Sequence, residues 1–224
     1  MNGTAPLLEI EDLVVEIQSM PALRGFSMQV ARGAMVSLVG RNGAGKTTLM
    51  RAIMGHLKAA RGAIRFEGTD LSTRPRHARA ALGIGYMPED RCLVPQLTVE
   101  ENILLPLWVA RHLDRKARLD FVYGVIGELT EMRHRKALLL SGGQQKLVAL
   151  GRALGIGTKC LLLDEPFEGI APALSERLSE VLASLKGKNL TLLMSQSDMN
   201  HSRDLIDVEF TIERGANLAS GEAG

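Results

Sequence analysis

Residues 40–47 read Gly-Arg-Asn-Gly-Ala-Gly-Lys-Thr and match the pattern Gly-x4-Gly-Lys-Ser/Thr, which is typical of loops that bind phosphate groups. The pattern stands between residues 35–39, an apolar run that predicts a buried strand, and residues 46–57, whose apolar side chains recur at helical spacing. Glycines let backbone N–H groups turn inward around oxygen anions, and the start of the helix adds its positive dipole end. The stretch therefore predicts a strand, a phosphate-binding loop and a helix in that order.

The loop predicts contacts with a nucleoside triphosphate and Mg²⁺. We expect Lys46 to reach the β- and γ-phosphates and the Thr47 hydroxyl to coordinate Mg²⁺. The expected phosphate-contacting residues are Gly40, Asn42, Gly43, Ala44, Gly45, Lys46, Thr47 and Thr48. The alternative is a glycine-rich turn without a ligand, and the Lys-Thr pair in register between the correct flanks argues against it.

Two carboxylates follow a second apolar run. Residues 160–163 read Cys-Leu-Leu-Leu, and Asp164 and Glu165 come next. A buried strand tolerates charge only at its exit, where a metal or water can satisfy it. We expect Asp164 to anchor Mg²⁺, and Glu165 to orient the attacking water or to accept its proton as general base. An Asp-Glu pair alone would indicate a solvated loop, but after a phosphate-binding loop it indicates a catalytic site.

The rest of the chain alternates predicted strands and helices. Further strands are predicted at residues 7–17, 62–68, 84–87, 190–194 and 208–212, a further helix at 173–185, and a helical, amphipathic region from 89 to about 151. This alternation indicates an α/β fold with a mainly parallel sheet that is covered on both faces, with extra strands in the first segment.

The composition excludes several classes of protein. The chain has 224 residues with 27 Lys and Arg against 25 Asp and Glu, and a formal charge of +2 does not favour a dedicated nucleic-acid binder. Five Phe, two Tyr and one Trp are few for a protein that stacks on bases or sugars. Two cysteines make no disulfide framework, and the chain shows neither a signal peptide nor an apolar run of the roughly 20 residues that a bilayer requires. We therefore expect a soluble protein in a reducing cytosol, with the basic cluster Arg74, Arg76, His77 and Arg79 on its surface.

A third motif, Leu-Ser-Gly-Gly-Gln-Gln at residues 140–145, lies between the other two. Its simplest interpretation is a helix N-terminus capped by Ser141. A helix start does not need two adjacent glycines, however, and a serine with backbone N–H groups at a helix N-terminus also makes an anion site. We expect Ser141, Gly142, Gly143 and Gln144 to form a second contact with nucleotide phosphate.

The three motifs and their order closely resemble the ABC ATPase family, and the resemblance covers residues 8–215. It implies an α/β fold with a P-loop NTPase core and a parallel-rich sheet, an N-terminal antiparallel β subdomain and a helical insertion. It implies one domain over residues 1–224, with the core and β subdomain at about 1–88 and 151–224 and the helical subdomain at about 89–150. In this family the Ser-Gly-Gly-Gln segment of one subunit meets the ATP held by another subunit, so that two ATP molecules lie between two chains.

Three segments resemble more closely the ATPase subunits of branched-chain amino acid importers. They are Tyr-Met-Pro-Glu-Asp-Arg at 86–91, Leu-Thr-Val-Glu-Glu-Asn-Ile at 97–103 and Asp-Glu-Pro-Phe-Glu-Gly-Ile-Ala-Pro at 164–172. Glu89 stands where most members have a glutamine that binds Mg²⁺. The resemblance implies membrane permease subunits, a second ATPase subunit of the same or another chain, a periplasmic substrate-binding protein and no nucleic acid. It places the chain in the cytoplasm, on the inner face of the cell membrane, with a permease docked near residues 111–118. For Trp108 and Val109 beside that run, the sequence is equally consistent with apolar contact to the permease and with core packing.

The sequence departs from the family at three functional positions, the first of which is Glu89, whose charge adds to that of Mg²⁺-bound phosphate in place of a neutral glutamine. Ile17 stands where members carry an aromatic ring that stacks on adenine, so we expect weaker or less selective base binding. The switch histidine is replaced by Ser197 if Asp198 is aligned with the family, or by Gln196 if the register shifts by one, and His201 is expected on the surface. Neither Ser197 nor Gln196 can supply the positive charge of histidine at the γ-phosphate.

These departures predict ATP binding with slow turnover, or turnover only beside a companion subunit. Three alternatives follow: a nucleotide-gated subunit with degenerate ATPase activity, an importer of another substrate such as urea or amides, and an ABC ATPase of DNA repair or translation. The last class usually carries large insertions or tandem domains, for which 224 residues leave no space.

Overall fold

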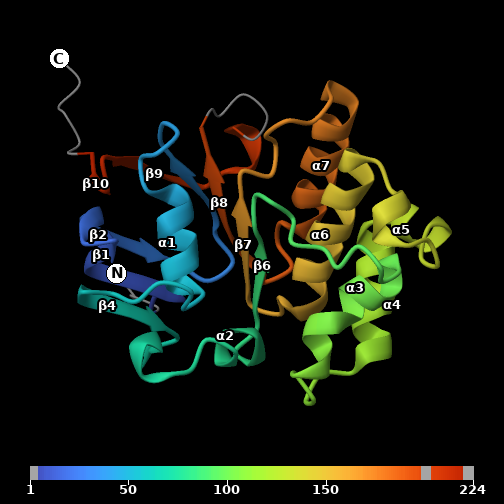
Figure 1. Cartoon of the computed structure of the whole chain (residues 1–224), viewed down its shortest axis with the longest axis horizontal. Coiled ribbons are helices and arrows are strands. Elements are labelled where there is room, and N and C mark those ends of the chain that lie inside the picture. The colour runs from blue at the N-terminus through green and yellow to red at the C-terminus, as the bar shows by residue number, and fades with distance from the viewer. Residues whose placement is uncertain (1–4, 198–202, 219–224) are drawn as a thin grey trace.

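A six-stranded, mainly parallel sheet forms the centre of the protein (Figure 1). The computed structural model describes residues 5–197 and 203–218. The sheet has the order β10-β9-β3-β8-β7-β6. Among the described strands of this sheet, β10 alone pairs antiparallel with its neighbour, and the other pairs are parallel. Its strands are β3 (Met35–Val39), β6 (Ile84–Met87), β7 (Cys160–Asp164), β8 (Thr191–Gln196), β9 (Val208–Glu213) and β10 (Ala216–Asn217).

The central strands are buried on both faces, which explains their continuous apolar runs. Successive side chains of a strand point to opposite faces. In β3, Val36 joins the core cluster that includes α1 (Lys46–Ile53), whereas Met35 joins the cluster that includes α6 (Gly142–Ile156) and α7 (Pro172–Leu185). The predicted α/β fold with a parallel sheet covered on both faces is confirmed.

A second, antiparallel sheet lies on the α1 side, in the order β2-β1-β4-β5. Its strands are β1 (Leu8–Ile17), β2 (Met20–Val30), β4 (Arg61–Phe66) and β5 (Thr69–Asp70). The strand at β2 was absent from the sequence prediction. Gln18 and Ser19, both with positive φ, connect β1 to β2 as a two-residue turn, and this dipeptide lacks the Asn-Gly or Asp-Gly signal of such hairpins.

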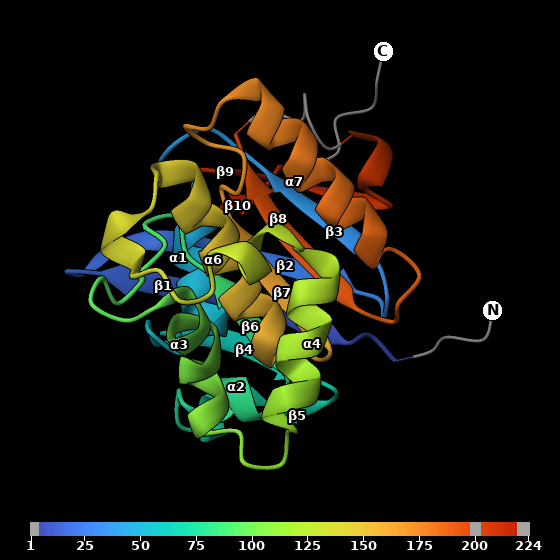
Figure 2. The same cartoon turned by 90° about the vertical axis from the view of Figure 1, so that its right-hand side faces the viewer.

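On the other face of the six-stranded sheet, α6 lies against the strands, and short helices pack around α6 on its outer side (Figure 2). They are α3 (Val99–Leu104), η2 (Leu105–Trp108), α4 (Arg115–Val125), α5 (Glu128–Glu131) and η3 (Ala137–Leu139). Helices α3 and α4 both pack on α6, whose last residues also contact β6. Three further short elements are η1 (Leu71–Thr73), α2 (Ala78–Ala81) and η4 (Arg203–Leu205). Helix α6 runs unbroken from Gly142 to Ile156 and packs against both the short helices and the strands of the sheet.

One member of the basic cluster is not on the surface. Arg79 is only 4% exposed, and its guanidinium donates to the carbonyls of Leu71 (2.6 Å), Arg74 and Ile53 (3.4 Å). The expectation of a surface position is therefore wrong for Arg79, because three backbone carbonyl groups near α1 and η1 accept hydrogen bonds from its buried guanidinium. Arg74, Arg76 and His77 are exposed, as expected. Within residues 5–197 and 203–218, no helix has the length and apolar character to cross a membrane.

The contact between β6 and α6 predicts that Gly85→Ala destabilises the fold. A Cβ atom on Gly85 would lie 2.1 Å from the carbonyl oxygen of Ala153, and backbone cannot give way like a flexible side chain. We expect a loss of about 1–3 kcal/mol in the free energy of unfolding. Urea denaturation measures it. The matched control is Gly124→Ala in α4, where a Cβ meets nothing within 4 Å and helix propensity should stabilise by up to about 1 kcal/mol. Equal effects of the two substitutions would contradict the prediction.

Candidate nucleotide-binding and catalytic site

The loop between β3 and α1 borders a cavity of about 540 Å³. Gly45, the residue before α1, has φ +115°, and a Cβ there would also approach Leu23 and the carbonyl of Ala22 at 3.0–3.1 Å. Gly43 has φ +81° and nothing within 4 Å of an added Cβ. Glycine is thus required at both positions by backbone conformation, and at Gly45 by space as well. The cavity is lined by Pro21, Ala22, Arg24, Asn42, Gly43, Gly45, Lys46, Thr47, Thr48, Glu89, Glu165, Glu168 and Arg214.

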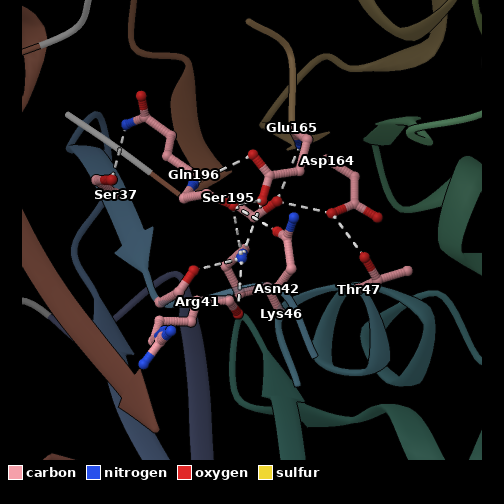
Figure 3. A network of polar contacts seen from close by, with 11 residues as sticks. Ser37, Arg41, Asn42, Lys46, Thr47, Asp164, Glu165, Ser195 and Gln196 are labelled. Carbon is pink, nitrogen blue, oxygen red and sulfur yellow. Dashed lines mark hydrogen bonds and ion pairs between the residues drawn. The ribbon is translucent and has the colours of Figure 1, made fainter. Parts of the chain in front are cut away.

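Lys46 is held by an ion pair and by backbone carbonyls (Figure 3). Its ammonium donates to the carbonyls of Gly40 (2.5 Å) and Arg41 (3.2 Å), and it lies 2.9 Å from Oε1 of Glu165. The Lys46 side chain is 5% exposed and that of Glu165 is 9% exposed, so the two charges compensate each other where water has little access. A phosphate that enters the loop competes with Glu165 for Lys46.

Asp164 sits at the end of β7 within reach of three hydroxyl groups. Ser195 donates to its Oδ1 at 2.6 Å, Thr47 donates to the same oxygen at 3.2 Å, and Tyr86 donates to Oδ2 at 3.4 Å. The residue is fully buried, and burial raises the pKa of Asp164 above its ordinary value, with Glu165 adding to the rise while the hydroxyl hydrogen bonds oppose it. The short bond to Ser195 fixes the carboxylate beside the Thr47 hydroxyl.

The oxygen atoms of Asp164 and Thr47 fit the chemistry of Mg²⁺. This ion takes one or two carboxylates and completes its shell with water and substrate phosphates. In the part of the chain that the structure describes, no three His, Cys, Asp or Glu residues gather as a metal-binding group, so the protein alone offers no closed cage. Glu89 lines the same cavity, and the pKa of its carboxyl is raised by burial and then by Glu168, Asp164 and Glu165.

Glu165 has an unusual backbone conformation, with φ +47°. Its N–H donates to Ser195 Oγ at 3.0 Å, so Ser195 holds both carboxylate residues. Ser197 contacts the Glu165 side chain twice: its N–H donates to Oε2 at 3.2 Å and its hydroxyl lies 2.8 Å from Oε1. The same hydroxyl lies 2.8 Å from Oδ1 of Asn42. Because a hydroxyl carries one proton, Ser197 can donate to only one of these two oxygens at a time.

The structure brings Ser197, but not Gln196, to the cluster around Glu165. Gln196 is 2% exposed and its side chain donates to Ser37 Oγ at 2.9 Å, on the opposite face of β8 (Figure 3). Adjacent residues of a strand point to opposite faces, so both cannot reach Glu165. The expectation for Gln196 therefore finds no support in the geometry. Asp198 and His201 lie outside the described residues.

The Ser-Gly-Gly-Gln segment begins α6 away from the cavity. Ser141 Oγ accepts from the Gln144 N–H at 3.2 Å, and the Gln144 side chain accepts from the Ser141 N–H at 3.0 Å, which makes a capping box. None of residues 141–144 lines the cavity. Ser141 and Gly142 are exposed, and so are Leu138 (52%) and Leu139 (60%) just before them.

Several residues at the site carry no recognisable sequence signal. Arg24 comes from β2 and Arg214 from the turn before β10, and backbone hydrogen bonds join these segments: Arg24 N–H donates to Gly215 O (2.7 Å), and Gly215 N–H donates to Ala44 O (2.8 Å). Ile17 is 43% exposed. At the turn between β1 and β2 it stands opposite Met20, and the preceding residue, Glu16, stands opposite Pro21. Pro21 lines the cavity and Ile17 does not.

Comparison with known proteins gives a consistent family. The family model described as ABC transporter matches residues 23–168. The chain is 33% identical to the high-affinity branched-chain amino acid transport ATP-binding protein BraG of Pseudomonas aeruginosa, over 93% of this chain and 90% of that protein. It is 30% identical to the lipopolysaccharide export system ATP-binding protein LptB of Haemophilus influenzae, over 96% and 90%. A solved nucleotide-free ATP-binding cassette from an ABC transporter superposes with a TM-score of 0.82 at 29% identity, over 96% of this chain and 90% of the other.

The shared contacts of Ser195 predict that Ser195→Ala lowers stability. The substitution leaves the fully buried Asp164 carboxylate without its shortest hydrogen bond and the Glu165 N–H without its acceptor. We expect a loss of about 1–3 kcal/mol in the free energy of unfolding at pH 7, measured by urea denaturation. Ser184→Ala is the control, because Ser184 is exposed on α7 and, among the residues that the structure describes, its hydroxyl donates to the carbonyl of Val181 alone. A loss no larger than that of the control would refute the role of Ser195.

Proposed function

Because this chain belongs to the ABC transporter family and is an ATP-hydrolysing subunit of that family, we propose that it energises the uptake of branched-chain amino acids or related small amino and organic acids. The observation that carries the ATPase chemistry is the cluster of Lys46, Asp164 and Glu165 at one end of the sheet. The import of branched-chain amino acids is supported by the three segments that resemble such importers and by 33% identity to BraG.

The proposed reaction begins when ATP phosphates enter the loop at residues 40–48. Lys46 exchanges Glu165 for the β- and γ-phosphates, and this releases the Glu165 carboxylate. Thr47 and Asp164, with Glu89 lining the same cavity, would hold a Mg²⁺ ion, which would supply positive charge against the phosphates. Glu165 orients a water molecule toward the γ-phosphorus and takes its proton, while the bond to the β–γ bridging oxygen breaks. Ser197 holds the Glu165 carboxylate through two contacts.

We propose that two ATPase subunits complete each ATP site. Residues 141–144 begin a helix whose N-terminal N–H groups suit an anion, yet they lie away from the cavity of their own chain. Exposed Leu138 and Leu139 next to this segment are apolar surface that a second subunit would cover. The half-exposed Trp108 and the exposed Val109, beside exposed Arg111, offer a mixed apolar and basic surface to a membrane permease. A periplasmic binding protein would deliver the substrate to that permease.

The catalytic role of Glu165 is tested by Glu165→Gln. The amide keeps the shape of the side chain but cannot take a proton, so we expect phosphate release to fall at least about a hundredfold. ATP binding should not weaken, because Lys46 loses the carboxylate that competes with phosphate. Phosphate release and ATP affinity are measured for the chain alone and with its companion subunit. Unchanged phosphate release in the pair would contradict the proposal.

The position of Ser197 predicts how turnover responds to a histidine. Ser197→His places an imidazole beside Glu165 and Lys46, where it can donate to a γ-phosphate oxygen. We expect kcat to rise roughly tenfold, a modest part of the 10²–10³ that one such donor supplies in other enzymes. Ser197→Ala should lower kcat, since Glu165 loses a hydroxyl contact at 2.8 Å. A histidine variant slower than the alanine variant would contradict this assignment.

The transported substrate is tested in the host. Deletion of the gene should reduce uptake of labelled leucine, isoleucine and valine, and a plasmid copy should restore it, whereas a Glu165→Gln copy should not. Labelled urea and an aromatic acid serve as substrate controls. A second candidate, the energising of lipopolysaccharide export, is favoured by 30% identity to LptB over 96% of this chain. Defective export of lipopolysaccharide with unchanged amino acid uptake would overturn the importer proposal in favour of this candidate.

A further inference from the structure

Lys146 is a buried lysine that the proposed reaction does not use. It lies in α6, five residues after Ser141, and it is 4% exposed. Its ammonium donates to the carbonyl oxygens of Glu165 (3.1 Å) and Glu168 (2.6 Å). Among the described residues, no carboxylate comes within ion-pair distance of this ammonium. Lys146 is therefore attached to the backbone of the loop that carries Glu165, and not to its side chain.

Burying a cation in this place is unfavourable. Burial and, after it, the charge of Arg91 lower the pKa of Lys146, and Glu168, Glu165 and Glu89 oppose them, with the result that the pKa is about 8. An amine keeps two N–H donors even when it is neutral, so the two contacts persist on either side of this pKa.

The loop that Lys146 holds is tightly turned. Glu165 has φ +47° and Gly169 has φ +65°, and the Glu168 N–H donates to the Glu165 carbonyl at 3.2 Å. Lys146 bonds the carbonyls at both ends of this turn. A conformation with positive φ at a glutamate persists only when its surroundings hold it. The Lys146 ammonium is one of these restraints.

The other end of the connection is the start of α6. Ser141 and Gln144 fix the first turn through the capping box, and Lys146 lies about 7.5 Å further along the helix axis. Arg91 donates to Gln145 at 3.1 Å, and Arg152 donates to the carbonyls of Arg91 and Cys92 at 2.5–2.6 Å, so α6 is braced along this side. A displacement of the first turn therefore passes to Lys146 as a movement of a rigid helix.

We propose that Lys146 is a positioning residue through which the first turn of α6 sets the orientation of Glu165. The proposal rests on the proposed role of Glu165 at the attacking water. When a phosphate contacts Ser141, the shift of α6 moves the Glu165 carbonyl through Lys146 and brings the carboxylate to the water. The ATP that occupies one chain thus controls the catalytic residue of the chain whose helix it touches.

The test compares Lys146→Met with a matched variant, Arg118→Met. Arg118 also donates to carbonyls of α6, those of Leu154 and Gly155, and to that of Gly157 directly after it, at the opposite end of the helix. For Lys146→Met we expect single-turnover hydrolysis, normalised to bound ATP, to fall about tenfold or more while ATP affinity changes less than about threefold. Arg118→Met should lower stability and leave hydrolysis per bound ATP unchanged. Equal hydrolysis by Lys146→Met and the wild type overturns the inference.

A second measurement does not depend on turnover. Hydrogen exchange of the amides of Glu165, Phe167 and Glu168 is followed in the wild type, Ser141→Ala, Lys146→Gln and the double variant; Pro166 has no N–H. We expect each single substitution to accelerate exchange, and Ser141→Ala to add nothing once Lys146 is replaced. Additive effects overturn the inference. An inactive wild type would refute the proposed function but leave this cycle able to decide whether Lys146 connects the two segments.

Discussion

The in-register parallel pairing of β3, β8 and β7 is the constraint on which the site depends. Asp164 pairs with Ser195, and Val39 pairs with Gln196, so the three strands end at the same edge of the sheet. The carboxyl ends of parallel strands meet there, and the glycine-rich loop, the two carboxylates and Ser197 follow those ends directly. A shift of one residue in β8 would exchange Ser195 and Ser197 for Gln196 on the face toward Asp164. The register of one strand thereby selects which side chain supports Glu165.

The edge that gathers these residues also concentrates charge in a place with little water. Lys46 and Glu165 compensate each other at 2.9 Å, while Asp164 relies on hydroxyl groups and has its pKa raised by burial. An ion pair of this kind stabilises little in net terms, but the loss of one partner is unfavourable. In the proposed reaction, entry of a phosphate offers Lys46 a new partner and leaves the Glu165 carboxylate without its cation, so that ATP binding and the release of the proposed base are one event.

The central fold could be predicted from the sequence, and so could the two segments that lie together at the candidate site, because each of them is a continuous local pattern. A strand, a glycine-rich loop and a helix are contiguous, and so are an apolar run and the Asp164–Glu165 pair. The sequence prediction missed β2, because Gln18-Ser19 is an unusual hairpin turn, and it placed Arg79 on the surface, because three backbone carbonyls are invisible in a residue pattern. The choice between Ser197 and Gln196 depended on strand register. Arg24, in β2, and Arg214, in the turn between β9 and β10, belong to different sheets and reach the same cavity only through the tertiary contact between the two segments.

Helix α6 connects an exposed segment at its start to buried residues next to Glu165. Its first turn presents Ser141 and Gly142 to solvent, whereas one turn later Lys146 is enclosed and bonded to the loop of Glu165. Its last turns lie so close to β6 that Gly85 has no space for a Cβ atom. In the proposed coupling, a contact at Ser141 tilts α6 about the end that the sheet holds. The first buried residue of α6 along that path is Lys146, which is bonded to the carbonyl of Glu165.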